Sequence, residues 1–346
     1  MTSPRSSAVD EYHWRPITAA DLDAWVALFA AVEAVDQEGE HVSVEQLAEY
    51  LDDPHMDFPR GTVAVFDSAG LMVAYCGLMA RSSADPEHRI WLQGAVHPEH
   101  RGRGLGGELL NWAKRASVPF HEQRFPGRPM SLFAHCAVKL PAALAMFERH
   151  GYRQTRWFNG MELDLAKDLA EGLPQAGRPD GVVFVPFGPE RSADALRVRN
   201  DSFRDHWGST ETSQEAWTHR LTSAVFRPEF TYLAYEQVGG ALGEPLALVL
   251  AEEYEARQRA TGRRDLYIAL VGTRRGARGR GLATALLTEI LRRARAEGFD
   301  TASLGVDSDS PTGSTRVYAR LGFRVTDTTV AQLLPVITGT GEAETS

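Results

Sequence analysis

A hexapeptide rich in arginine and glycine occurs twice in the chain, in copies 177 residues apart. The first copy is Arg101-Gly102-Arg103-Gly104-Leu105-Gly106, and the second is Arg278-Gly279-Arg280-Gly281-Leu282-Ala283. Glycine leaves room for an anion to approach the backbone, and the first N–H groups of a following helix point at that anion. The arginine side chains add positive charge. Each copy therefore predicts a binding site for a pyrophosphate or a similar anion.

Two kinds of ligand could use such a loop. Gly102, Gly104 and Gly107 match the spacing of the dinucleotide-binding fingerprint. However, the second copy has Thr284 in place of the third glycine, and a charged segment, residues 97–100, separates the first copy from its strand. These features disfavour a nicotinamide oxidoreductase. Coenzyme A is the other ligand class that carries a pyrophosphate.

Both copies resemble the Arg-x-x-Gly-x-Gly/Ala signature of the GCN5-related N-acetyltransferases (GNAT). Residues 309–323 resemble the Asn-x-x-Ala-x-x-x-Tyr-x-x-x-Gly-Phe segment of that family, although Ser310 and Ser314 replace its asparagine and alanine. Two such units in one chain are similar to the tandem acetyltransferases of actinobacteria. The resemblance implies an α/β protein with two tandem GNAT folds, each a mixed, mostly antiparallel sheet flanked by helices.

The resemblance also implies acetyl-CoA as the cosubstrate and a primary amine of a small molecule as the acceptor. In this family the amine attacks the thioester directly, in a complex of the enzyme with both substrates. The residues expected to bind coenzyme A belong to the two loops and to the strands before them: Val96, Arg101, Gly102, Arg103, Gly104, Gly106, Val271, Thr273, Arg278, Gly279, Arg280, Gly281, Leu282 and Ala283.

The departing thiolate benefits from a general acid, which the family often supplies as a tyrosine. Tyr318 stands at that position in the second unit, and Phe147 stands there in the first. Phenylalanine cannot donate a proton. We therefore expect the second unit to be catalytic and the first to bind coenzyme A without turnover or to serve as a scaffold.

The general base is expected near the strand that precedes the second loop. Glu252 and Glu253 end the strand before it, and Asp265 opens it. Neighbouring side chains on a strand point to opposite faces, so only one of the two glutamates can face the cleft. We favour Glu253 and take Asp265 next. Each is also readily explained as a solvated surface carboxylate.

A polar segment after the first helix of the second unit is the expected acceptor loop. It contains Asp205, His206 and Trp207 beside a glycine, and in GNAT proteins this region covers the acceptor pocket. His206 is a further candidate for base or acceptor ligand, although a capping or surface histidine is the more frequent role. No cluster of cysteine, histidine and acidic residues has the spacing of a metal site.

The elements around the loops repeat as well, which predicts a duplicated domain. Strand-like runs at residues 90–96 and 266–273 precede the loops, and amphipathic helix patterns at 105–115 and 282–295 follow them. We expect an N-terminal domain at 1–170, a linker at 171–180, a C-terminal domain at 181–337 and a disordered tail at 338–346. The second unit should contain strands at 182–187, 230–236, 246–253 and 301–306, a helix at 313–321 and a last strand at 323–329.

Composition sets outer limits on function. The 346 residues carry a net charge of −9, which argues against nonspecific nucleic-acid binding. No apolar run is long enough to cross a membrane. Cys76 and Cys136 are expected to lie in the core, and two isolated thiols fit a cytoplasmic protein. We expect the protein to be a monomer or a homodimer. The alternative to an enzyme is a non-catalytic CoA-binding regulatory or interaction protein.

Overall fold

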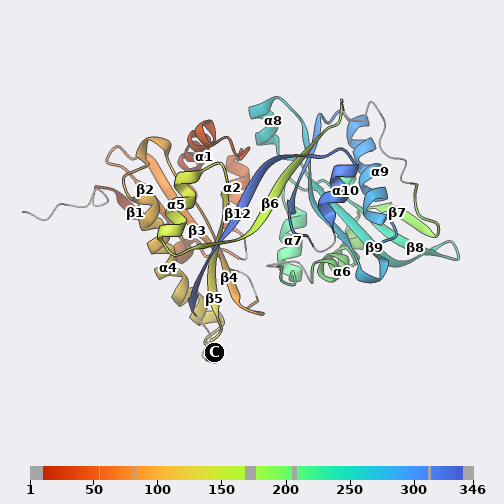
Figure 1. Ribbon diagram of the computed structural model, residues 1–346, viewed down its shortest axis with the longest axis horizontal. Helices are drawn as coiled ribbons and strands as arrows, with labels where there is room; N and C mark the ends of the chain where they lie inside the picture. Colours follow the sequence, from red (N-terminus) through yellow and green to blue (C-terminus); the bar gives the residue numbers. More distant parts are fainter. Residues whose placement is uncertain are drawn as a thin grey trace, which may run out of the picture. The chain divides into compact units, whose positions relative to one another are not determined.

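The computed structural model describes residues 11–53, 55–80, 83–167, 177–204, 209–310 and 313–337, and the chain divides into two compact units (Figure 1). Unit 1 contains the chain as far as Thr155 together with the segment from Thr329 onward, and unit 2 contains Arg156–Thr328. Each unit is a sheet with helices on both faces, so the predicted α/β class is confirmed.

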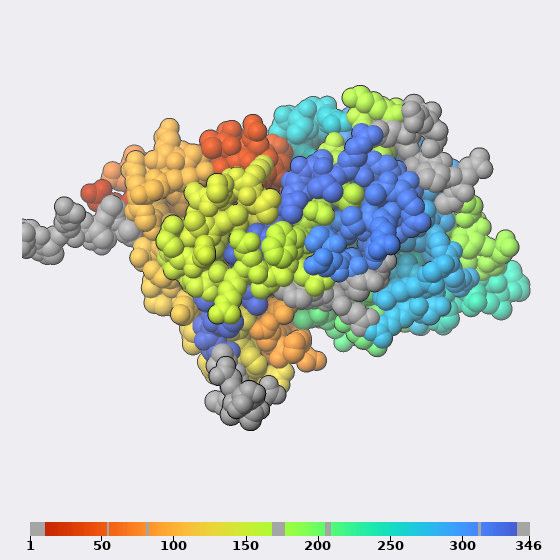
Figure 2. Space-filling view, in the orientation of Figure 1, coloured from red at the N-terminus to blue at the C-terminus, as the bar shows by residue number. Residues whose placement is uncertain are grey.

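The described part of unit 1 is a six-stranded sheet with helices on both faces. Its strands are β1 (His13–Arg15), β2 (Thr62–Phe66), β3 (Met72–Ala80), β4 (His88–Val96), β5 (Met130–Ala137) and the second part of β12 (Arg324–Ile337). Its helices are α1 (Leu22–Asp36), α2 (Val44–Leu51), α3 (Phe58–Gly61), α4 (Leu105–Arg124) and α5 (Pro141–Arg149). In the space-filling view the yellow-green surface of this unit belongs to α5 and the chain that follows it (Figure 2).

Unit 2 repeats most of this order of elements. Its strands are β6 (Arg153–Asp164), β7 (Val182–Pro186), β8 (Tyr232–Val238), β9 (Ala241–Glu252), β10 (Asp265–Thr273) and β11 (Thr301–Asp307). Its helices are α6 (Ser192–Phe203), α7 (Gln214–Thr222), α8 (Glu255–Thr261), α9 (Leu282–Ala296) and α10 (Ser314–Arg320). Of these, α8 is an additional helix between β9 and β10. A single turn of 3₁₀ helix precedes each loop, at Pro98–His100 and Arg275–Ala277.

Each sheet is completed by a strand from the other half of the sequence. In unit 1 the order is β1-β2-β3-β4-β5-β12, and β12 pairs with β5 from Thr329 to Ile337. In unit 2 the order is β6-β11-β10-β9-β8-β7, and β6 pairs with β11. The compact units therefore differ from the domains expected at 1–170 and 181–337, because the two outer strands are exchanged. The expected linker and tail lie largely outside the described residues.

The alternation of side chains along the strands creates two cores in each unit. In β9, Ala247 and Val249 pack in the core beneath α9 and α10, whereas Leu248 and Leu250 pack in the core beneath α6 and α7. Residues of one strand thus reach both helical layers, as a sheet covered on both faces requires. The same arrangement holds in unit 1, where α4 and α5 cover one face and α1 and α2 the other.

Most expected elements of the second unit are present, with small shifts at their ends. The last strand is the exception, since it runs from Arg324 to Ile337 rather than ending at residue 329. Cys76 and Cys136 are both buried and free, as expected. Among the described helices, none has the length and apolar character needed to cross a membrane.

Candidate functional site

The strand before each loop separates from its parallel neighbour. In unit 2, β10 pairs with β11 only from Asp265 to Tyr267, while β11 stays paired with β6 as far as Asp307. In unit 1, β4 pairs with β5 only over the four residues His88 to Trp91. The separation opens a fork in each sheet and leaves backbone groups of β10 and β4 available on that edge. A ligand can therefore bind along the strand through main-chain hydrogen bonds.

Only the strand of unit 2 is bulged. The register of β10 against β9 shifts between Ile268 and Leu270, which leaves Ala269 as an extra residue. The register of β4 against β3 runs without a shift from Ile90 to Val96. Bulges redirect backbone groups and are frequent beside active sites. The two forks are thus similar in topology but different in local backbone geometry.

Both loops have the backbone conformation that suits an anion. Gly279 and Gly281 have φ of 76°, and Gly102 and Gly104 have φ of 74° and 90°, a region that favours glycine. No heavy atom lies within 4 Å of where a Cβ would stand at these four positions. Gly281 and Gly104 are the N-caps of α9 and α4, which have 15 and 20 residues. Helices of this length present unpaired N–H groups and a positive dipole end at that point.

The first arginine of each loop fastens the loop to its own strand. Arg278 donates from Nε to the carbonyl of Thr273 at 3.3 Å and from Nη2 to the carbonyl of Ser202 at 2.9 Å. Arg101 donates from Nε to the carbonyl of Val96 at 3.1 Å and forms a bidentate pair with Asp36, both bonds being 2.7 Å. These guanidinium groups shape the loop, so the backbone N–H groups and the exposed Arg280 are better placed to meet a phosphate.

Two family models match the chain, one over each loop and its flanking strands. The acetyltransferase (GNAT) family matches residues 194–323, and an acetyltransferase (GNAT) domain matches residues 59–154. A mycothiol acetyltransferase of Nocardia farcinica is 30% identical over 87% of this chain and 90% of its own length. The chain belongs to the GNAT acetyltransferase family.

Other relatives span nearly the whole chain. A mycothiol acetyltransferase of Frankia casuarinae is 28% identical over 89% of this chain and 92% of its own. Among solved structures, a GCN5-related N-acetyltransferase from Sphaerobacter thermophilus has 26% identity and a TM-score of 0.75, covering 96% of this chain and 98% of its own. These similarities extend over both GNAT units and confirm that the protein is an N-acetyltransferase of the tandem type. GNAT enzymes use acyl-CoA as the acyl donor.

The tyrosine position differs between the two GNAT units. Tyr318 is buried in unit 2, its ring meets Phe323 edge-on at 6.0 Å, and burial raises the pKa of its phenol above the usual value. In unit 1 the two ring types are reversed, with Phe147 meeting Tyr152 at 5.2 Å. The Tyr152 hydroxyl is buried and has no hydrogen-bond partner among the described residues. Sequence analysis identified Phe147 at the tyrosine position of unit 1. It did not identify Tyr152 as the residue of this ring pair that carries the hydroxyl.

Asp265 is a buried carboxylate of β10 beside the fork of unit 2. It is 7% exposed, and it lies two residues before Tyr267, the last residue paired with β11. One carboxylate oxygen, Oδ2, accepts a hydrogen bond from Ser303 at 2.5 Å. The other, Oδ1, is buried and has no hydrogen-bond partner in the described structure. A strand rises about 3.3 Å per residue, so the Cα of Asp265 lies roughly 7 Å from that of Tyr267, where the fork begins.

Glu252 forms a polar cluster on the same side of β9 as the fork. It accepts hydrogen bonds from Arg220 and from the Tyr254 hydroxyl, each at 2.7 Å. The ring of Tyr254 meets that of Tyr267 edge-on at 5.9 Å. Burial, and then the charge of Glu252, raise the pKa of both phenols. Sequence analysis placed only one of Glu252 and Glu253 at the cleft, and the structure places Glu252 there.

Glu253 lies on the opposite face of the sheet from Glu252, where it forms ion pairs with two arginines. Its oxygens accept from Arg264 at 2.6 and 3.2 Å and from Arg227 at 2.9 Å. Burial opposes ionisation of this carboxylate, but the hydrogen bonds from the arginines outweigh it and lower its pKa. A general base must take up a proton during the reaction, and the two arginines that hold Glu253 disfavour its protonation. We therefore assign Glu253, our favoured base from the sequence, a structural role.

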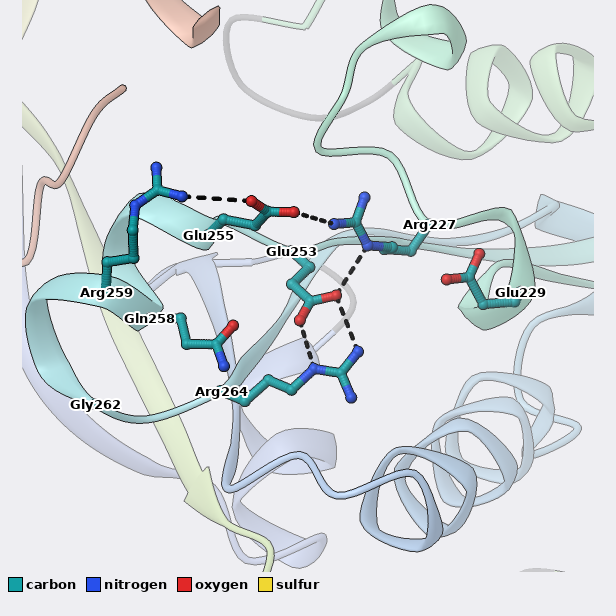
Figure 3. A pocket seen from close by; sticks show the side chains of 8 residues that line it. All are labelled: Arg227, Glu229, Glu253, Glu255, Gln258, Arg259, Gly262 and Arg264. Carbon is teal, nitrogen blue, oxygen red and sulfur yellow. Dashed lines mark hydrogen bonds and ion pairs between the residues drawn. The ribbon is translucent and has the colours of Figure 1, made fainter. Parts of the chain in front are cut away.

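The hollow beside Glu253 is an open, charged depression of about 660 Å³. Figure 3 shows Glu253 between Arg227 and Arg264, with Glu255 bridging Arg227 and Arg259. The guanidinium of Arg264 also packs over the ring of Phe299, at 3.9 Å from its centroid. The charges of this depression neutralise one another, and its face is the one covered by α9. It is thus separate from the fork cluster around Glu252.

Glu253→Gln tests the structural role of this carboxylate. We expect the free energy of unfolding of unit 2 to fall by about 2 kcal/mol at neutral pH, since a hydrogen bond to a charged group contributes about 1.5–3 kcal/mol. A carboxylate with a lowered pKa stabilises the fold fully above its unfolded-state pKa, and this stabilisation is lost as the pH falls through the folded-state pKa. The difference between the variant and the wild type should therefore shrink in acid.

Urea unfolding between neutral and acidic pH measures this difference. Glu255→Gln is the matched control, because Glu255 is an exposed neighbour in the same depression and exposed pairs contribute at most about 1 kcal/mol. A difference that stays constant or grows in acid would contradict the assigned ion pairs.

The fork of unit 1 carries a buried histidine pair where unit 2 has Asp265. His88 opens β4 as Asp265 opens β10. The Nδ1 atoms of His88 and His121 are 2.9 Å apart, and both side chains are fully buried. His121 Nε2 lies 2.9 Å from the carbonyl of Arg128. A carbonyl can only accept, so Nε2 of His121 is the donor to Arg128. Sequence analysis missed this pair, because residues 33 positions apart give no local signal.

Asp205, His206 and Trp207 lie outside the described residues. Within the part of the chain that the structure describes, no group of three or more histidine, cysteine and acidic side chains could hold a metal ion.

Proposed function

We propose that the protein is an acetyl-CoA-dependent N-acetyltransferase that acts on a primary amine of a small molecule, with its chemistry in unit 2. The observation that carries the proposal is the coincidence in unit 2 of a bulged strand, a glycine-rich loop, a free carboxylate oxygen on Asp265 and the Tyr318 hydroxyl. Unit 1 retains the loop, but it has an unbulged strand, His88 in place of the carboxylate and Phe147 in place of the tyrosine.

The loop of unit 2 fits the pyrophosphate of the donor. The left-handed glycines leave the backbone approachable, and the N-terminus of α9 supplies N–H groups and a positive dipole end. Arg280 is exposed beside them. The free edge of β10, including Val271 and Thr273, would hold the amide groups of the pantetheine arm. Acetyl-CoA, once bound, supplies an activated thioester carbonyl at the fork.

Three groups of unit 2 would then act on the two substrates. Asp265 Oδ1 accepts the proton that the acceptor ammonium must lose, through a short chain of water molecules. Backbone N–H groups of the separated part of β10 stabilise the negative charge that develops on the carbonyl oxygen. Tyr318 donates its proton to the departing thiolate, and its raised pKa keeps that proton in place at neutral pH.

The acceptor is a polyfunctional amine in this proposal. Tyr254, Tyr267, Glu252 and Arg220 offer hydroxyl, carboxylate and guanidinium groups at the fork, which suits a cation that also carries hydroxyl groups. The curated relatives are named mycothiol acetyltransferase. The desacetyl form of mycothiol is therefore the first acceptor to test.

For unit 1 we propose donor binding without turnover. Its loop keeps the same left-handed glycines as that of unit 2, whereas the groups that would transfer protons are replaced. The number of acetyl-CoA molecules that bind to each chain distinguishes this role from that of a scaffold.

Gly281→Val and Gly104→Val form a matched pair for testing both proposals. A side chain at positive φ distorts the loop at a cost of about 1–2 kcal/mol, and it also fills the space in which a phosphate would sit. We expect the wild type to bind two acetyl-CoA molecules in native mass spectrometry and no NAD. Gly281→Val should lose one of them together with turnover, whereas Gly104→Val should lose one and keep turnover.

The outcomes separate the proposals. Preferential binding of NAD would contradict the use of acetyl-CoA. Loss of turnover in Gly104→Val, with turnover retained in Gly281→Val, would contradict catalysis by unit 2. A single acetyl-CoA per wild-type chain that disappears in Gly281→Val would overturn donor binding by unit 1 and leave it a scaffold.

A further inference from the structure

The carboxylate of Asp265 is asymmetric in its surroundings. Its Oδ2 accepts a short hydrogen bond of 2.5 Å from Ser303 Oγ and lies 3.8 Å from the guanidinium of Arg257. Its Oδ1 is buried but has no hydrogen-bond partner among the described residues. An ionised carboxylate offers about four lone-pair positions, and burying an unused one is costly. A buried oxygen without a hydrogen bond does not stabilise the fold, so its presence points to a role in the reaction.

The parallel register of the fork places Ser303 beside Asp265. Asp265 pairs with Thr301 and Tyr267 pairs with Ser303, in the last three pairs before β10 and β11 separate. Ser303 is 7% exposed, as is Asp265, so water does not compete for the hydrogen bond. Arg257 is held in turn by Glu162, at 3.3 Å. One edge of the carboxylate is thus fixed by two elements, β11 and α8.

We propose that Ser303 is a positioning residue that acts through Asp265. Its hydroxyl holds Oδ2, orients the carboxylate so that Oδ1 serves the reaction, and stabilises the ionised form that accepts the proton. This inference rests on the proposed function, because it assigns a role to a neighbour of the proposed base. The charged and titratable groups around Asp265 come from four further elements and from β10 itself: Arg257 of α8, Glu162 of β6, Glu252 of β9, Arg220 of α7 and Tyr267.

The sign of the expected effect follows from this arrangement. Removing the Ser303 hydroxyl removes a donor to the ionised carboxylate, and a carboxylate that has lost a donor is protonated more readily. The base is then inactivated at a higher pH than in the wild type. In Ser303→Ala we expect the acidic limb of the kcat/KM profile to move upward by about one pH unit, because one hydrogen bond to a charged group corresponds to a shift of this size.

The experiment compares kcat/KM against pH for the full chain with acetyl-CoA and the amine acceptor that it turns over. Ser303→Ala should show the shifted limb, and Ser303→Thr, which keeps a hydroxyl, should restore the wild-type limb. Ser131→Ala is the matched control, because Ser131 is a buried strand serine of unit 1 that donates to the Glu87 carboxylate at 2.6 Å. It removes an equivalent bond and should leave the profile unchanged. A merely structural role of Ser303 would lower the melting temperature without moving the limb.

The failure of this inference is distinguishable from the failure of the proposed function. If Asp265→Asn is inactive while Ser303→Ala keeps the wild-type limb, the positioning role is overturned and the base assignment stands. If Asp265→Asn keeps full turnover, the base assignment fails, and the role of Ser303 fails with it. In the supporting case, Ser303→Ala added to Asp265→Asn causes no further change, since the two residues act as one unit.

Discussion

Asp265→Asn is expected to lower kcat at neutral pH by a factor of about 10² to 10⁴, the range that a general base contributes, with the affinity for acetyl-CoA unchanged. The amide is nearly isosteric with the carboxylate and can still accept a hydrogen bond from Ser303 through its oxygen. It cannot take up the proton of the acceptor ammonium. Steady-state kinetics at saturating amine, together with the dissociation constant for acetyl-CoA, measure the two quantities separately.

Asp21→Asn provides a control of the same chemical type. Asp21 is 5% exposed in unit 1, and hydrogen bonds from Arg15 above all hold its pKa at about 2. The control variant should lose stability but keep the kcat of its folded fraction. Equal losses of kcat in both variants would show that the effect of Asp265→Asn comes from the loss of any buried carboxylate rather than from a base at the fork.

Tyr318→Phe is expected to lower kcat by a factor of about 10² or more, because a general acid typically contributes 10² to 10⁴. The ring keeps its edge-on contact with Phe323 and its place in the core, so packing is preserved and acetyl-CoA should bind as before. The loss should diminish when the leaving thiol is more acidic and needs less assistance. Kinetics with thioester donors of differing thiol acidity measure this dependence.

Tyr152→Phe is the counterpart in unit 1. It removes a buried hydroxyl that has no hydrogen-bond partner in the described structure, so we expect unchanged turnover and a stability that is equal or slightly higher. A variant of Tyr318 that matched Tyr152→Phe in turnover would sink the assignment of Tyr318 as the acid.

The local features of both units could be predicted from the sequence. The glycines of the loops, the strands before them and the helices after them depend on neighbouring residues, and a duplicated pattern reinforced each of them. The position of Asp265 at the start of β10 could also be predicted. These are properties of spacing and periodicity within about 20 residues.

The features that sequence reasoning missed depend on distant partners. Glu253 looked free until Arg264 and Arg227 were placed against it. Arg101 and Arg278, which recur at the same position of the two loops, fasten these loops to Val96 and Thr273 rather than presenting free charges. The bulge at Ala269 arises from pairing with β9, because a register shift is a property of two strands and not of one.

The exchanged strands have a consequence for how the chain is synthesised. The sheet of unit 1 lacks its outer strand until the segment beginning at Thr329 has left the ribosome, 174 residues after Thr155. At about 5–20 residues per second, this delay is roughly ten to thirty seconds. During that time β5 offers an unpaired edge, which other strands can join. The nascent chain therefore has to keep β5 from pairing with other strands until β12 has been synthesised. A cut of the gene between the two sequence copies would separate β12 from the sheet of unit 1.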